Sequence, residues 1–118
     1  MDVNFEFVRG DTFSFTFELE DFTEELDSCY FSCKENVEDT TYAFQKSIGN
    51  GIEKVSTNTY RVKLERNDTI NLVVGLTYFH DVEIGNNGDF LTIISGQLKL
   101  KQDITRPADV VVSSEQGE

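Results

Sequence analysis

The feature that most constrains the fold is an alternation of apolar and polar residues near the start of the chain. In segment 12–19, Phe13, Phe15, Phe17 and Leu19 alternate with Ser, Thr and Glu. Successive side chains of a β-strand point to opposite sides of the sheet, so a period of two places these four apolar side chains on one face. The segment therefore predicts a half-buried β-strand.

Similar segments, rich in aromatic and β-branched residues, recur along the chain and predict further strands. Segment 20–27 has no regular period and is expected to form a loop, and segment 67–72 is expected to form one helical turn capped by Asn67 or Asp68. Short strands at regular spacing predict an all-β antiparallel sandwich of about eight or nine strands with little helix. The nine candidate strands are 3–7, 12–19, 28–34, 43–47, 51–55, 59–64, 77–84, 90–94 and 97–101.

Turn residues separate several of these segments. Gly49-Asn50-Gly51 and Asn86-Asn87-Gly88-Asp89 contain residues that accept a positive φ, so both predict β-hairpins, and antiparallel pairing of strands consecutive in sequence is expected. Arg9-Gly10-Asp11 matches the integrin-binding tripeptide, but its place between two strands predicts a tight turn.

A chain of 118 residues has room for one core. We expect a single sandwich domain over residues 1–107 and a C-terminal tail over 108–118 that is flexible or docks on a partner. Within that tail, the apolar run Val110, Val111 and Val112 is the candidate partner contact.

Charge and composition exclude several classes of function. The chain has 22 Asp and Glu against 10 Lys and Arg, and its net charge of −12 repels phosphate backbones and anionic lipids, so we expect neither nucleic acid nor a membrane as partner. The sequence shows no signal peptide and no apolar run long enough to span a membrane, which predicts synthesis in a cytoplasm without export by a signal sequence.

Few residues could support catalysis or metal binding. His80 is the only histidine, and its parity groups it with Tyr78, Val82 and Ile84, while Phe79, Asp81 and Glu83 point to the other side. Cys29 and Cys33 lie about 13 Å apart on one face of a predicted strand, too far to form a disulfide. We interpret all three as structural residues and predict no catalytic residue, cofactor or zinc site. A calcium ion held by loop carboxylates is a minor alternative, with Asp21, Glu24, Glu25 and Asp27 as candidates.

Four segments, taken in order, resemble the N-terminal domain of phage baseplate upper proteins. These segments are Phe5-Glu6-Phe7-Val8-Arg9-Gly10-Asp11-Thr12-Phe13, Tyr78-Phe79-His80-Asp81-Val82-Glu83-Ile84, Leu91-Thr92-Ile93-Ile94-Ser95-Gly96-Gln97-Leu98-Lys99-Leu100 and Asp103-Ile104-Thr105-Arg106-Pro107. The resemblance covers about residues 3–107, with 21–58 similar only in strand rhythm. It implies an immunoglobulin-like sandwich and a non-enzymatic structural role in a phage or prophage tail, baseplate or fibre, with synthesis in a bacterial cytoplasm and incorporation into a virion. The partners it implies are other tail or baseplate proteins, or further copies of the chain.

Two alternatives accompany this expectation. Charged residues at the strand edges would keep the domain monomeric, with Glu6, Glu18, Lys63 and Glu65 as candidates. A carbohydrate- or ligand-binding sandwich would instead use exposed aromatic side chains beside carboxylates, with Tyr30, Tyr42, Tyr60 and Tyr78 as candidates.

Overall fold

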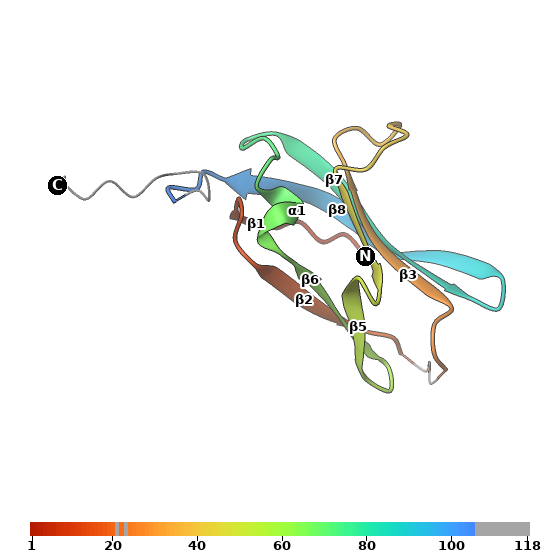
Figure 1. Ribbon diagram of the computed structural model, residues 1–118. Coiled ribbons are helices and arrows are strands. Elements are labelled where there is room, and N and C mark those ends of the chain that lie inside the picture. Colours follow the sequence, from red (N-terminus) through yellow and green to blue (C-terminus); the bar gives the residue numbers. More distant parts are fainter. Residues whose placement is uncertain (21, 23, 106–118) are drawn as a thin grey trace.

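The computed structural model describes residues 1–20, 22 and 24–105, which fold into an all-β sandwich with a single helical turn (Figure 1). The predicted fold class is therefore confirmed. None of the described helical residues forms a helix long and apolar enough to cross a membrane. The elements are β1 (Phe5–Val8), β2 (Phe13–Glu18), β3 (Ser28–Lys34), β4 (Phe44–Ile48), β5 (Gly51–Ser56), β6 (Thr59–Leu64), α1 (Arg66–Thr69), β7 (Thr77–Asn86) and β8 (Asp89–Lys101).

All the described strands belong to one sheet, in the order β1-β8-β7-β3-β4-β5-β6-β2. The sheet bends back on itself at β4 and β5, so that β5, β6 and β2 face the larger layer formed by the other strands (Figure 1). The inward side chains of the two layers form the core, in which Phe31, Val62, Val82 and Leu98 are fully buried. Alternation in the sequence thus translates directly into an inner and an outer face.

The expected pairing of consecutive strands is wrong for the first two strands. β1 pairs in parallel with β8, with Phe5 opposite Leu98, and β2 pairs antiparallel with β6. The turn at Arg9-Gly10-Asp11, predicted from the sequence and confirmed, carries the chain from one layer to the other instead of returning it along β1. Gly10 has a φ of 83°, and its backbone N–H donates to Thr69 Oγ1 at 2.8 Å.

The two predicted hairpin turns have different outcomes. Asn86 pairs with Asp89, and the two residues between them, Asn87 and Gly88, both have positive φ, so the β7–β8 hairpin is confirmed. The segment 49–51 does not form a hairpin, because β4 and β5 run parallel across it. Its two glycines, also at positive φ, turn the chain through a tight loop that passes it to the second layer without reversing its direction.

Three smaller expectations concern the last strand, the helical turn and the C-terminal tail. Segments 90–94 and 97–101 form one long strand, β8, because Ser95 and Gly96 remain paired with β7. The helical turn is present, but its N-cap is Glu65, whose backbone N–H donates to Asp68 Oδ2 at 2.7 Å. The predicted tail, including Val110, Val111 and Val112, lies outside the described residues.

Candidate functional site

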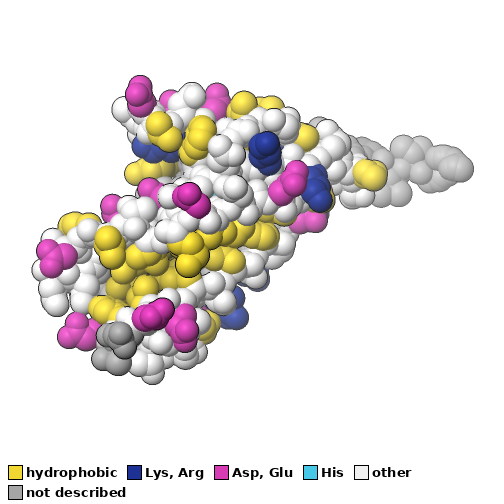
Figure 2. All heavy atoms as spheres, turned by 180° about the vertical axis from the view of Figure 1, so that it is seen from behind, with side chains coloured by type: hydrophobic (Ala, Val, Ile, Leu, Met, Phe, Trp, Pro, Cys, Tyr) yellow, Lys and Arg dark blue, Asp and Glu magenta, His cyan; other side chains and the backbone are white. Residues whose placement is uncertain are grey.

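The sheet is open along one side of the sandwich, where its two end strands, β1 and β2, face each other without pairing. Aromatic rings fill this gap, which we call the seam: Phe7 stacks on Phe13 with 4.3 Å between ring centroids, and Phe5 lies 4.8 Å from Phe15. All four rings are only half-buried. Seen from behind, hydrophobic side chains gather in a band across the molecule between its two layers (Figure 2). Ring packing therefore replaces backbone hydrogen bonds at the seam.

Beside the seam, β8 extends past the strand that covers its outer edge. The N-terminal residues continue the parallel pairing of β1, and the backbone N–H of Ser95 donates a hydrogen bond to the Met1 carbonyl at 2.9 Å. Residues 89–92 of β8 have no neighbour on that edge among the described strands. Phe90 and Leu91 are 66% and 62% exposed there, on a hairpin that projects beyond the rest of the sandwich (Figure 1). This segment is an uncovered strand edge with apolar side chains.

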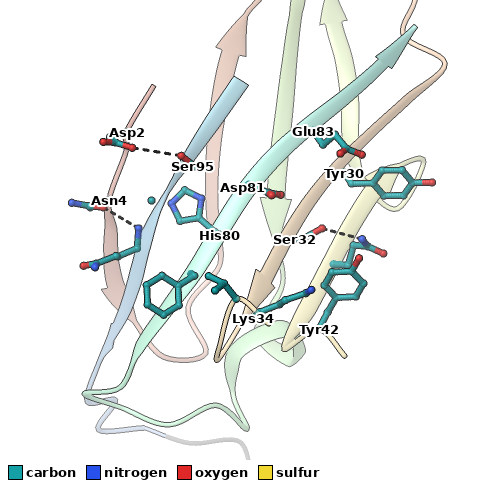
Figure 3. Close-up of a pocket in the computed structure, with 15 residues that line it drawn as sticks. Asp2, Asn4, Tyr30, Ser32, Lys34, Tyr42, His80, Asp81, Glu83 and Ser95 are labelled. Atoms are coloured by element: carbon teal, nitrogen blue, oxygen red, sulfur yellow. Dashed lines mark hydrogen bonds between the residues drawn. The ribbon is translucent and has the colours of Figure 1, made fainter. Parts of the chain in front are cut away.

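A broad groove lies on the outer face of the larger layer (Figure 3). Four adjacent strands, β8, β7, β3 and β4, provide its floor, and the N-terminal residues and the loop from 35 to 43 flank it. Its volume is about 900 Å³. The lining side chains include Asp2, Asn4, Tyr30, Ser32, Lys34, Val37, Tyr42, Gln45, Phe79, Asp81, Glu83, Ser95 and Gln97.

The groove combines aromatic rings with carboxylates. Tyr30 lies opposite Glu83 in the pairing of β3 with β7, and their side chains lie beside each other in Figure 3. Lys34 donates to the carbonyl of Asp39 at 2.7 Å, and its ammonium lies 5.1 Å from the centre of the Tyr42 ring. These contacts fix the lysine at one end of the groove.

The polar residues of the floor are partly shielded from water. Burial raises the pKa of the Asp81 carboxyl, an effect that the nearby positive charge of Lys34 opposes. Asp81 lies opposite Ser32, whose hydroxyl oxygen accepts a hydrogen bond from Gln45 Nε2 at 2.9 Å. Carboxylate, hydroxyl and amide groups therefore lie side by side on the floor.

The four tyrosines considered from the sequence separate into two pairs. Tyr30 and Tyr42 are 37% and 49% exposed and line the groove. Tyr60 and Tyr78 are buried, so their assignment as exposed stacking platforms is wrong. Their hydroxyl oxygens accept hydrogen bonds from the backbone of Leu26 and Val73 respectively. Sequence reasoning missed Phe79 in the groove, although its parity, opposite to that of the buried Tyr78, already placed it on the outer face.

The candidate catalytic residues lie in the core. The pairing of β3 with β7 places Cys33 directly opposite His80, and Cys29 is buried on the same face. Burial raises the pKa of each thiol to about 12 and lowers the pKa of His80, so at neutral pH the thiols stay protonated and the imidazole neutral. A thiolate–imidazolium pair is therefore disfavoured at the one place where the two residue types meet.

His80 instead helps to position the N-terminal residues. Its Nε2–H donates to the carbonyl of Val3 at 2.7 Å, and its ring packs against the rings of both Phe5 and Phe31. A Cβ atom on Gly96 would lie 2.0 Å from the same carbonyl oxygen, so the absence of a side chain there leaves room for it. His80 and Gly96 thus both position the Val3 carbonyl, His80 by a hydrogen bond and Gly96 by leaving room for it.

In the Arg-Gly-Asp segment, the Arg9 side chain makes its contacts within the fold. The Arg9 guanidinium forms an ion pair with Asp103 at 2.7 Å and donates to the carbonyl of Leu72 at 3.0 Å. The side chains of Arg9 and Asp103 are 12% and 3% exposed. This contact joins the first and the last of the four segments on which the family resemblance rests.

The calcium alternative requires several carboxylates to lie close together. Among the described residues, no group of three or more His, Cys, Asp or Glu side chains could hold a metal ion, and Asp21 lies outside them.

Of the four charged residues expected to protect the sheet edges, Glu6 and Glu18 do lie on the end strands β1 and β2. Lys63 lies on the interior strand β6, with Glu65 just after it, so the prediction that these two charges protect a sheet edge is wrong.

Comparison with known proteins adds no family. The sequence matches no protein-family model, and a search of the curated proteins gives no match. The resemblance to phage baseplate upper proteins stays a prediction, based on the four segments quoted above.

Proposed function

We propose that this chain is a non-enzymatic structural module of a phage or prophage tail, baseplate or fibre. It acts through protein–protein contacts at the outer edge of β8. The observation that carries the proposal is the outer edge of β8 over residues 89–92, on which no described strand pairs, with Phe90 and Leu91 exposed on a projecting hairpin. Unpaired strand edges accept further strands from other chains, and exposed apolar side chains add buried area to such contacts.

Two further observations support a structural role. Arg9, Gly10, Gly96 and Asp103, which belong to the family-like segments, make tight contacts that hold the sandwich together. The cysteines and the histidine are buried in forms unsuited to nucleophilic chemistry. A second copy of the chain is the partner that can be tested directly.

Molar mass in solution tests this proposal. We expect the full chain to form a defined oligomer in light scattering after size-exclusion chromatography, at low and high salt. Phe90→Ser combined with Leu91→Ser should produce a monomer, whereas Val73→Ser, at a residue 55% exposed and outside the hairpin, should not. Loss of the oligomer in a chain that ends at Pro107 would show that the segment containing Val110, Val111 and Val112 contributes.

A full chain that remains monomeric at every concentration and salt would contradict self-association. The proposal would then require an unlike tail protein at the same edge. An oligomer unaffected by the double substitution would contradict the assignment of this hairpin as the contact.

A further inference from the structure

The groove on the outer face is separate from the strand edge considered above. The edge belongs to the outer side of β8, whereas the floor of the groove is made by side chains that rise from β8, β7, β3 and β4 (Figure 3). Both β7 and β3 are hydrogen-bonded to a neighbour on each side, so their backbones have no free ladder groups for an incoming peptide strand. A ligand in the groove must therefore be recognised by side chains.

Those side chains are of the kinds that recognise sugars. Tyr30 and Tyr42, both exposed, and the half-buried Phe79 present ring surfaces against which the C–H face of a pyranose can pack, since the faces of aromatic rings are electron-rich. Asp81 and Glu83 provide carboxylate oxygens that can accept hydrogen bonds from sugar hydroxyls, and such charge-assisted bonds are stronger than neutral ones. Ser32, Gln45 and Gln97 add hydroxyl and amide groups that can donate or accept.

The charge of the groove selects among sugars. Three carboxylates, Asp2, Asp81 and Glu83, line it against one ammonium, Lys34, which is already held by the Asp39 carbonyl and the Tyr42 ring. The net charge of the whole chain is −12. An oligosaccharide of uronic acids or with sulfate groups would be repelled, whereas a neutral one would not. The volume of about 900 Å³ lies within the range of about 300–1,000 Å³ usual for small-ligand sites.

We propose that this groove binds a neutral oligosaccharide, with the rings of Tyr30 and Tyr42 packing against sugar rings and Asp81 and Glu83 accepting hydrogen bonds from hydroxyls. The site is independent of the assembly edge. Binding of sugar and association of chains should therefore respond to different substitutions.

Saturation-transfer NMR and calorimetry on the full chain test the proposal, with cellohexaose, maltohexaose and fully N-acetylated chitohexaose as neutral probes and hexagalacturonate as the anionic probe. We expect at least one neutral hexasaccharide to bind and hexagalacturonate not to bind. Tyr30→Ala and Tyr42→Ala should each weaken binding about tenfold, which corresponds to the loss of one aromatic contact. Asp81→Asn should weaken it by about tenfold or more, through loss of a charged acceptor.

The control variant is Val73→Ser, at an exposed residue that lies outside both the groove and the β7–β8 hairpin. It should bind the sugar as the parent chain does. Circular dichroism and molar mass establish that Tyr30→Ala, Tyr42→Ala and Asp81→Asn are folded and assembled as the parent is.

Three results would overturn the proposal. One is the absence of binding by all three neutral probes, and another is equal binding of hexagalacturonate. The third is sugar binding that survives both Tyr30→Ala and Tyr42→Ala, which would place the site outside the groove. None of these results bears on the oligomeric state, so the two proposals fail separately.

Discussion

Removal of the Arg9 side chain should destabilise the fold more than removal of any exposed cation. The guanidinium forms an ion pair with Asp103 at 2.7 Å and a hydrogen bond with the Leu72 carbonyl at 3.0 Å, and the two charged side chains are 12% and 3% exposed. Arg9→Ala takes the cation away from an almost fully buried carboxylate. Breaking a buried ion pair in this way costs about 3–5 kcal/mol, a large part of the roughly 5–15 kcal/mol that stabilises a typical domain.

Urea unfolding followed by circular dichroism measures this loss. With a slope of about 1–3 kcal/mol per molar urea, a loss of about 3 kcal/mol lowers the midpoint by roughly 1–3 M. Arg61→Ala is the matched control, because Arg61 pairs with Glu53 and the two side chains are 44% and 61% exposed, where an ion pair contributes only about 0–1 kcal/mol. The combined variant Arg9→Ala and Asp103→Ala should lose less stability than the sum of the two single changes. Equal midpoints for Arg9→Ala and Arg61→Ala would refute the reasoning.

Three further predictions concern His80, Gly96 and the two cysteines. Burial lowers the pKa of His80 in the folded state. The free energy of unfolding should therefore fall as the pH drops below about 6.5 towards the folded pKa, because the unfolded chain then binds more protons. Urea titrations from pH 7 to pH 5 should show a smaller dependence of this free energy on pH in His80→Gln, and an unchanged dependence would contradict the assignment of the effect to His80. Gly96→Ala should destabilise the fold by about 1–3 kcal/mol, because its Cβ would collide with the Val3 carbonyl; faster amide exchange of Ser95, which pairs with the N-terminal residues, would locate the effect. Cys29 and Cys33, each with a pKa raised to about 12, should not react with a disulfide reagent at pH 8 until the chain is unfolded, and rapid labelling of the native protein would show that they are accessible.

Alternation in the sequence predicts faces, and the faces are confirmed. Tyr78, His80 and Val82 are buried, while Phe79 and Asp81 lie on the outer face, as parity required. The Asn87-Gly88 turn was predictable for a similar local reason, because few residue pairs accept positive φ at two consecutive positions. Local chemistry thus determines which segments are strands and where one hairpin turns.

Partners of the strands could not be predicted in the same way. The parallel pairing of β1 with β8 depends on hydrogen bonds between segments at opposite ends of the described chain, and alternation carries no information about them. The glycines at 49 and 51 gave the same signal as a hairpin, although the chain passes between layers there. The groove was also hidden, since outward-facing residues such as Asp81 and Gln45 have the same pattern whether they meet bulk solvent or a shared concavity.

The parallel contact between β1 and β8 sets the order in which this protein can fold during synthesis. β1 is made first, but its partner residues, 98–101, are synthesised only after about 90 further residues have been added. At about 5–20 residues per second this delay lasts roughly 5–20 s, and pairing across such a separation is slow even in the complete chain. During that interval the backbone hydrogen-bonding groups of β1 have no β8 in their own chain to pair with, so strands of neighbouring nascent chains compete with β8 for the same hydrogen bonds.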